Sequence, residues 1–361
     1  MYGKQILSEM APYKQGKQME EVKAEYGLTK IVKLASNENP FGYSPVLRDQ
    51  MSSLVGQFEL YPDGHAAELR TKVAKTLTVS DDQLVFGSGS DELVQIICRT
   101  FLYPGVNTVM ATPTFPQYKH HSLVEGAEVR EIPTVNGYHD LQGMLRSIDD
   151  QTKVIWLCSP NNPTGSLIPE EAFYSFMEQC PQDVLVVLDE AYYEFIEPKR
   201  QYNTIAAIKS YSNLLCLRTF SKAYGLAGLR VGYGIGAKNL INKLNVVRGP
   251  FNTSSFAQKA ASIAIDDQDF IRKTNERNIA IKQDFQRFLD GIGWEYDDSE
   301  TNFLFVKLPV SGNELFTYLL KRGFIVRPGE AIGCPTNTVR ITIGNEHDMK
   351  QLQTILNDFS Q

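Results

Sequence analysis

The stretch L-R-T-F-S-K-A-Y-G-L-A-G-L-R-V-G extends from Leu217 to Gly232. It follows an apolar run typical of a buried strand, and a second strand-like run begins at Val231. Between the two runs stand Lys222, directly preceded by a serine, and then Arg230. A lysine fixed in this way suits imine chemistry on an aldehyde that carries a phosphate, because the amine attacks the aldehyde while the serine and the arginine hold the phosphate.

The two strands around Lys222 are expected to run antiparallel. Only eleven residues separate Arg218 from Arg230, and a parallel crossover usually needs about a dozen or more. Strand-like and helical stretches alternate from about residue 60 to 235, which predicts a mostly parallel, doubly wound α/β sheet with one antiparallel strand. The expected strands are 84–86, 108–111, 129–132, 154–158, 184–188, 214–217 and 231–235.

The last third of the chain predicts a smaller α+β domain. A long helical pattern from about residue 254 to 292 is a candidate bridge into it. We expect an N-terminal arm (1–35) that packs with the small domain, a large α/β domain (36–253), and the bridging helix with the small domain (254–361). Within the small domain, the expected strands are 301–308, 324–327 and 338–343, and the expected helices are 313–321 and 346–359.

Composition narrows the class of protein. At 361 residues, the chain is long enough for about two domains. A formal net charge of −6 without a basic block argues against nucleic-acid binding. Five widely spaced cysteines without a C-x-x-C motif support neither a disulfide framework nor a zinc ribbon, and we expect no metal site. The sequence shows no signal peptide and no run of 18 apolar residues, so a cytoplasmic protein without a membrane span is expected.

The segment Gly87 to Glu92, G-S-G-S-D-E, predicts an anion site. It joins a short strand to an apolar helix, for which Ser90 or Asp91 would be the N-cap. Exposed N–H groups at such a helix start bind an anion. Glu92 stands where a dinucleotide-binding motif has its third glycine, and a P-loop G-K-[ST] is missing, so a single phosphate fits better than a dinucleotide or ATP.

Three further residues, Asp189, Phe115 and Asn162, are candidates for contact with a ligand, and a fourth residue, Tyr61, stands at a turn. Asp189 ends the most continuous apolar strand and would need a cationic partner, such as a protonated pyridine nitrogen. Phe115 could cover a ring face, or it could be a core aromatic. Asn162 could bind a ligand oxygen or form an Asx turn. Tyr61 is the first residue of the turn Y-P-D-G, and it could simply be a surface aromatic.

Together these motifs resemble the fold-type I pyridoxal-phosphate aminotransferases, most closely the histidinol-phosphate aminotransferases. The resemblance extends over almost the whole chain, from Pro12-Tyr13 to Gly344. Its most specific pieces are Y-P-D-G (61–64), S-P-N-N-P-T-G (159–165), L-D-E-A-Y (188–192) and R-T-F-S-K-A-Y-G-L-A-G-L-R (218–230), in the order of the family.

The resemblance implies a role for each matching residue. Lys222 would join the cofactor aldehyde and then move a proton between the substrate Cα and the cofactor, with Asp189 and Tyr192 as the other catalytic residues. Asn162 and Tyr192 would bond the phenolic oxygen of pyridoxal phosphate, and Phe115 would stack on its ring. The residues expected to bind the cofactor phosphate are Gly89, Ser90, Asp91, Ser221, Arg230 and, from the other subunit of a homodimer, Tyr61.

The resemblance also implies the substrates. Arg340 would bind the carboxylate of glutamate, and Arg327, Tyr13, Asn37 and Asn162 are candidates for further substrate contacts, including those to a phosphate ester. The implied reaction moves an amino group between L-histidinol phosphate and 2-oxoglutarate in histidine biosynthesis. An aromatic amino acid aminotransferase, a threonine-phosphate decarboxylase on the same scaffold and a cofactor-sensing domain of a transcription regulator are the alternatives. The last is disfavoured, because no basic helix-turn-helix precedes the domain.

Overall fold

The computed structural model describes residues 3–12, 16–54 and 59–360. Within these residues, the largest sheet has seven strands in the order β2-β8-β7-β6-β5-β3-β4. The predicted fold class is confirmed, and each expected strand of the large domain is present within one or two residues. The strands are β2 (Leu84–Gly87), β3 (Asn107–Thr112), β4 (Glu128–Pro133), β5 (Thr152–Cys158), β6 (Leu185–Asp189), β7 (Leu214–Thr219) and β8 (Gly232–Gly236).

Strand β8 is the expected antiparallel strand. It pairs antiparallel with both β7 and β2, whereas the pairs from β7 to β4 are all parallel. The segment between β7 and β8 therefore turns back within a dozen residues, without a crossover helix. This short connection holds Lys222 at the carboxyl end of the sheet.

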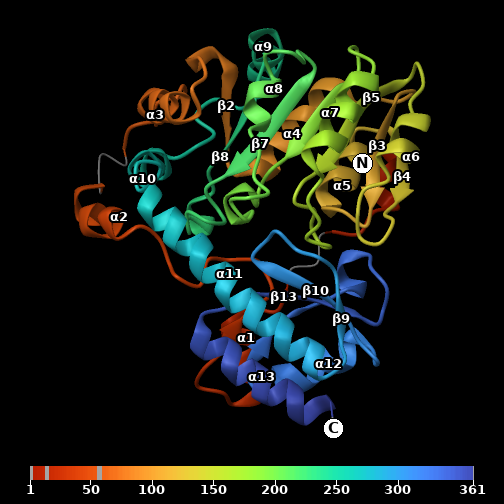
Figure 1. Ribbon diagram of the computed structural model, residues 1–361. Helices are drawn as coiled ribbons and strands as arrows, with labels where there is room; N and C mark the ends of the chain where they lie inside the picture. The colour runs from red at the N-terminus through yellow and green to blue at the C-terminus, as the bar shows by residue number, and fades with distance from the viewer. Residues whose placement is uncertain (1–2, 13–15, 55–58, 361) are drawn as a thin grey trace.

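Alternate strand residues feed two hydrophobic cores, one on each face of the sheet. In β2, Phe86 belongs to one core and its neighbour Val85 to the other. Helices on both faces close these cores, as expected of a doubly wound fold (Figure 1). The Val85 core is covered by α4 (Ser90–Phe101), α5 (Pro116–Val124) and α9 (Lys238–Val247), and the Phe86 core by α3 (Ala67–Leu77), α6 (Leu141–Arg146), α7 (Glu170–Gln179), α8 (Thr204–Ala207) and α10 (Ser255–Ala264).

The C-terminal part forms a separate lobe below the large sheet in Figure 1. Its sheet has the order β12-β13-β10-β9 and packs against three helices around one apolar core. The elements are β9 (Glu295–Tyr296), β10 (Phe303–Lys307), β12 (Arg327–Pro328), β13 (Thr338–Thr342), α11 (Gln268–Gly291), α12 (Gly312–Leu320) and α13 (Glu346–Ser360).

N-terminal segments pack against this C-terminal part. Strand β1 (Val32–Lys33) pairs in parallel with β11 (Phe324–Ile325). Val22 of α1 (Met19–Tyr26) lies in a small core with Leu320. The arm also contacts a helix that covers the large sheet, because Lys4 donates a hydrogen bond to the Val124 carbonyl of α5 at 2.8 Å. The proposed boundaries after residues 35 and 253 stay a prediction.

The long helical pattern at 254–292 is two helices, not one. Helix α10 ends at Ala264, and α11 begins at Gln268 after the N-cap Asp267, whose carboxylate accepts a hydrogen bond from the Phe270 N–H at 3.1 Å. The same carboxylate accepts a hydrogen bond from the Ser44 hydroxyl, just before α2 (Pro45–Gln50). A capping aspartate with a tertiary partner therefore breaks a pattern that has no glycine or proline near the break. In the described ranges, no helix combines the length and apolar character needed to cross a bilayer.

Candidate active site

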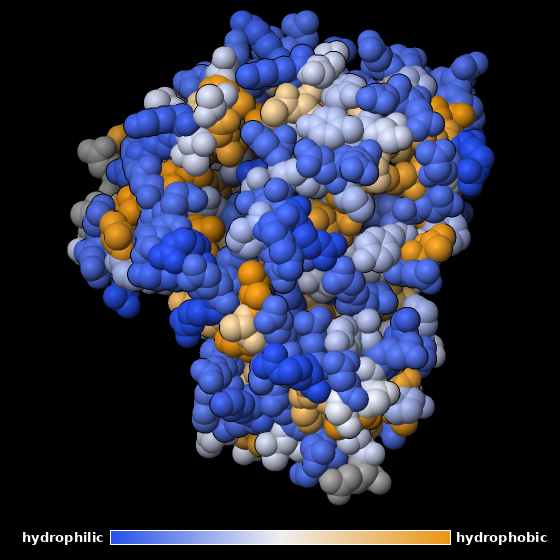
Figure 2. Space-filling model, viewed as in Figure 1, coloured by the Kyte–Doolittle hydropathy of each residue, from blue (hydrophilic) through white to orange (hydrophobic). Residues whose placement is uncertain are grey.

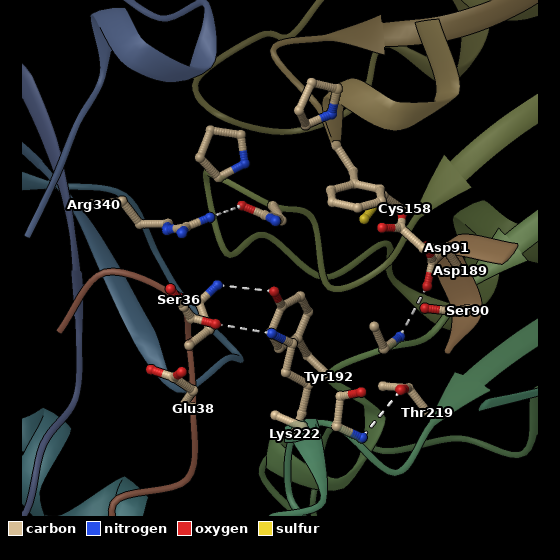
Figure 3. A pocket seen from close by; sticks show the side chains of 18 of the residues that line it. Ser36, Glu38, Ser90, Asp91, Cys158, Asp189, Tyr192, Thr219, Lys222 and Arg340 are labelled. Atoms are coloured by element: carbon tan, nitrogen blue, oxygen red, sulfur yellow. Dashed lines mark hydrogen bonds between the residues drawn. The ribbon is translucent and has the colours of Figure 1, made fainter. Parts of the chain in front are cut away.

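A cavity of about 380 Å³ lies where the carboxyl ends of β5, β6 and β7 face β12 and β13 of the C-terminal sheet. Carboxyl ends of parallel strands are the usual place for ligands in α/β sheets. Figure 3 shows Arg340 on one side of this cavity, Asp189 and Asp91 on the other, and Lys222 beside Tyr192 between them. Residues far apart in sequence thus meet in one space.

Lys222 presents its amine to the cavity from the β7–β8 connection. Its Nζ donates a hydrogen bond to the Ser36 carbonyl at 3.0 Å and lies 5.7 Å from the centre of the Tyr192 ring. Burial and then the positive charge of Arg340 lower the pKa of Lys222 to about 8, against an opposing effect of Glu38. A larger fraction of this amine is therefore neutral and nucleophilic near pH 7 than for a solvated lysine.

Asp189 is a buried carboxylate at the end of β6. Its Oδ2 accepts a hydrogen bond from the Tyr118 hydroxyl at 2.6 Å, and its Oδ1 accepts one from the Ala191 N–H at 3.1 Å. Burial raises the pKa of Asp189 to about 6, although both hydrogen bonds lower it. The group is thus mostly ionised at neutral pH and suits a cationic ligand atom.

The start of α4, with Gly89, Ser90, Asp91 and Arg230, forms the candidate anion cradle, and its N-cap differs from the prediction. Gly89 is the N-cap, with a φ of +80°, while Ser90 and Asp91 belong to the first helical turn. A Cβ at Gly89 would lie 2.2 Å from the Arg230 Nη2, so only glycine lets the guanidinium approach this backbone. Arg230 also donates to the Ser221 hydroxyl at 3.2 Å. The prediction of a Ser90 or Asp91 cap was wrong because the positive-φ turn ends the loop one residue earlier.

Asn162, Tyr192 and Asn37 place polar groups on the cavity wall. The Asn162 side-chain oxygen accepts a hydrogen bond from Arg340 Nη1 at 2.6 Å, which leaves its NH₂ as the donor for a ligand. Asn37 Nδ2 donates to the Tyr192 hydroxyl at 2.9 Å. Phe115 lines the same cavity from the start of α5. These four side chains were chosen from sequence, and the structure brings them together.

Two arginines contribute the opposite wall. Arg327 in β12 and Arg340 in β13 are direct partners in the antiparallel register, so their side chains share one face of the small sheet. Both are about 7% exposed and line the cavity. Arg340 also donates to the Ala35 carbonyl at 2.7 Å, and Arg327 to the Ala331 carbonyl at 3.3 Å. This wall is suited to acidic groups of a substrate.

One predicted residue is not brought to the cavity of this chain, and a second lies outside the described residues. Tyr61 is 82% exposed and stacks on Phe251, with ring centres 4.8 Å apart. Tyr13 lies outside the described residues, although the nearby Gly16 lines the cavity. Gly89 contributes to the cradle through its backbone.

The sequence reasoning missed Tyr118, Ser36 and Cys158, which contact or line the site. For Tyr118 a signal existed: it follows Phe115 by three residues at the start of a helix, so the two side chains share one face. Ser36 acts through its backbone carbonyl, which no sequence pattern reports. Among the described residues, no cluster of three or more His, Cys, Asp or Glu could hold a metal ion.

A family model described as aminotransferase class I and II matches residues 29–359. The chain belongs to the class I and II aminotransferases. The histidinol-phosphate aminotransferase 2 of Oceanobacillus iheyensis is 54% identical over 360 residues, which cover 99% of each chain. The histidinol-phosphate aminotransferase of Bacillus subtilis is 51% identical over 354 residues, 98% of each chain.

Solved structures of other aminotransferases share the fold. The histidinol-phosphate aminotransferase of Sinorhizobium meliloti, solved in complex with pyridoxal-5'-phosphate, superposes with a TM-score of 0.90 and is 26% identical, covering 99% of this chain and 97% of that one. The L-threonine-O-3-phosphate decarboxylase of Porphyromonas gingivalis reaches a TM-score of 0.82 at 24% identity, covering 91% and 99%. This second likeness concerns the fold alone, because such scaffolds host different reactions.

Proposed function

We propose that this aminotransferase moves the amino group between L-histidinol phosphate and 2-oxoglutarate, giving imidazole-acetol phosphate and glutamate, as a step of histidine biosynthesis. One observation carries the proposal: the paired guanidinium groups of Arg327 and Arg340 share a cavity with the Lys222 amine and the Asp189 carboxylate. Such an arrangement places an acidic substrate beside the reacting amine. The names of relatives that are about half identical over their full length support the choice.

The cavity fits pyridoxal phosphate as the cofactor. At one end of the cavity, the Arg230 guanidinium lies so close to the start of α4 that a Cβ at Gly89 would be 2.2 Å from it, which suits a phosphate; at the other, the buried Asp189 carboxylate suits a cationic ring nitrogen. When bound, the cofactor supplies an aldehyde for the amino group and a ring that accepts electrons released at the substrate Cα. The residues that would hold it are Lys222 at the aldehyde, Asp189 at the ring nitrogen, Asn162 and Tyr192 at the phenolic oxygen, Phe115 on the ring face, and Gly89, Ser90, Asp91, Ser221 and Arg230 at the phosphate.

The reaction then depends on proton movement by Lys222. Its Nζ would take up the proton released from the substrate Cα and hold it for return, while the cofactor would supply the carbon that receives it. Arg340 assists in two ways, because its charge favours the neutral amine and its guanidinium binds the substrate acid. Asp189 would hold the ring nitrogen, and its negative charge would stabilise a proton there.

Both substrates need the arginine wall. Glutamate carries an α-carboxylate, whereas histidinol phosphate has a phosphate ester instead. Arg340 binds the carboxylate in our proposal, and Arg327, with Asn37 and Tyr13, adds the contacts that a larger dianion requires. An imidazole pocket also admits other flat rings, so activity on aromatic amino acids is an expected side reaction.

We further propose a homodimer in which Tyr61 reaches the cofactor phosphate of the other subunit. Exposed apolar side chains gather on segments around α2, α3 and α10, where apolar areas interrupt the largely hydrophilic surface in Figure 2. These exposed side chains include Tyr43, Val46, Leu60, Tyr61 and Phe251. A cytoplasmic location is proposed as well, because all five cysteines are free thiols.

The test is a product assay on the purified enzyme reconstituted with pyridoxal phosphate. With histidinol phosphate and 2-oxoglutarate, we expect glutamate to form at a higher kcat/KM than with phenylalanine or tyrosine as donor. A preference for the aromatic donors would make the enzyme an aromatic aminotransferase. Release of CO₂ from threonine phosphate without glutamate formation would make it a decarboxylase.

A further inference from the structure

Tyr118 of α5 is the main hydrogen-bond donor to Asp189. The Tyr118 side chain is fully buried, and its hydroxyl lies 2.6 Å from Asp189 Oδ2. Its ring stacks on Trp156 of β5, with centres 4.7 Å apart and planes 11° apart. Trp156 is itself fixed, because its Nε1 donates to the Thr108 hydroxyl at 2.9 Å. The phenol therefore has one orientation, set by two neighbouring strands.

The other groups around Asp189 do not replace this contact. The acidic side chains of Asp91, in α4, and Glu190, next in sequence, act against its negative charge. Cys158 in β5 and Tyr192 also lie close enough to interact with the carboxylate, and burial raises the pKa of both well above neutrality, so both stay uncharged. Within the described residues, the carboxylate accepts one other hydrogen bond, which comes from the Ala191 N–H.

We propose that Tyr118 is a positioning residue that keeps Asp189 a weak base, so that the proton shared with the cofactor stays on the ring nitrogen. The proposal rests on the proposed function, since it needs pyridoxal phosphate with its ring nitrogen toward Asp189. A carboxylate that accepts a short hydrogen bond from a phenol holds its negative charge more readily and takes up a proton less readily. Without that bond, the buried Asp189 competes better for the proton, and the ring becomes a poorer acceptor of electrons.

The test uses pyridoxal phosphate labelled with ¹⁵N in the ring, bound to the wild-type enzyme and to Tyr118→Phe. Phenylalanine keeps the ring that stacks on Trp156 and removes only the hydroxyl. We expect the ¹⁵N chemical shift of the wild type to be that of a protonated pyridine, and that of Tyr118→Phe to move toward the unprotonated value. The kcat should fall about tenfold, the loss typical of one hydrogen bond to a charged group, with a smaller change in KM.

The matched control is Tyr202→Phe. Tyr202 is a partly buried tyrosine outside the cavity whose hydroxyl donates to the Ile168 carbonyl at 2.9 Å, so its loss tests stability alone. We expect this control to leave the ¹⁵N shift and kcat unchanged. If Tyr118→Phe does not fold, para-aminophenylalanine at position 118 retains the shape and a weaker donor, and should give an intermediate ¹⁵N shift.

Two outcomes overturn the inference. One is a ¹⁵N shift in Tyr118→Phe, or in the para-aminophenylalanine variant, that equals the wild-type shift. The other is a change in the ¹⁵N chemical shift of Tyr202→Phe as large as that of Tyr118→Phe, which would attribute the effect to general destabilisation of the protein. A wild-type enzyme that fails to bind the labelled cofactor would instead contradict the proposed function, so the two failures are distinguishable.

Discussion

At the scale of single residues, the amine of Lys222 is governed by burial and by the charge of Arg340. Burial and positive charge both disfavour the protonated lysine, which is why its pKa falls to about 8. Covalent attachment of pyridoxal phosphate needs the neutral amine, so its rate should rise with pH through about 8 and then level off. Stopped-flow absorbance of the apoprotein mixed with cofactor measures this profile.

Replacing Arg340 with glutamine should move that profile to higher pH. The substitution removes the repulsion and leaves the burial, so the pKa of Lys222 rises but stays below that of a solvated lysine. The control is Arg322→Gln, because Arg322 lies over the Tyr318 ring on the surface of the C-terminal part and not in the cavity. A pH profile that is identical in Arg340→Gln and the wild type would contradict this account.

Arg327 should discriminate between the two substrates. Arg327→Gln should raise the KM for histidinol phosphate roughly 10- to 100-fold, as expected for lost hydrogen bonds to a charged group, and should change the KM for glutamate far less. Steady-state kinetics with each substrate varied in turn measure both constants. Equal increases for the two substrates would assign Arg327 to a contact that both share.

Residues with distinctive chemistry inside a motif could be identified from sequence. Lys222, Asp189 and Arg340 each combine a reactive group with a position beside a predicted strand, and all three line the cavity. Tyr118 was missed because its role comes from a carboxylate 71 positions away in sequence, which periodicity cannot show. The predicted N-cap of α4 was wrong. Ser90 and Asp91 are both good capping residues, but the backbone conformation of Gly89 decides where the turn ends.

At the scale of elements, β8 sets how closely the sheet approaches the start of α4. A methyl group on Gly232 would lie 2.6 Å from the Ser90 nitrogen, so Gly232→Ala should push the anion cradle away. Overpacking of this kind costs roughly 1–3 kcal/mol. We therefore expect the Kd for pyridoxal phosphate to rise about tenfold or more in fluorescence titrations.

Gly234→Ala in the same strand is the control for that prediction. Its added methyl would meet the side chains of Val85 and Leu217 at 3.1 and 3.3 Å, not the cradle backbone. The variant should lower the Tm and leave the Kd for the cofactor nearly unchanged. Equal effects of the two substitutions on the Kd would show that β8 does not shape the cradle.

Strands were easier to predict than helix boundaries. Apolar runs between turns located the strands of the central sheet, most of which are buried on both faces, whereas the edge strand β4 is partly exposed. The single helical pattern at 254–292 concealed a break at Asp267, whose carboxylate is engaged by Ser44 from a distant segment. An aspartate N-cap is a local signal for a helix start, but its contact with Ser44 is tertiary and could not be predicted from the sequence.

At the scale of the whole molecule, the proposed homodimer with shared sites makes a complementation prediction. Lys222→Ala and Tyr61→Ala should each have little activity alone. In a mixture that exchanges subunits, a hybrid dimer has one site with both native residues, so activity should recover to about a quarter of wild type. Sedimentation of each variant checks that both remain dimeric. No recovery despite subunit exchange would mean that Tyr61 does not complete the partner's site.

The most direct test asks which lysine carries the cofactor. Lys282 provides an internal comparison, since burial also lowers its pKa to about 8, but it bonds the Ser299 and Thr301 carbonyls outside the cavity. After reconstitution with pyridoxal phosphate, borohydride reduction and peptide mapping by mass spectrometry, we expect the label on Lys222 and none on Lys282. An unlabelled protein, or a label that does not favour Lys222, would contradict the account.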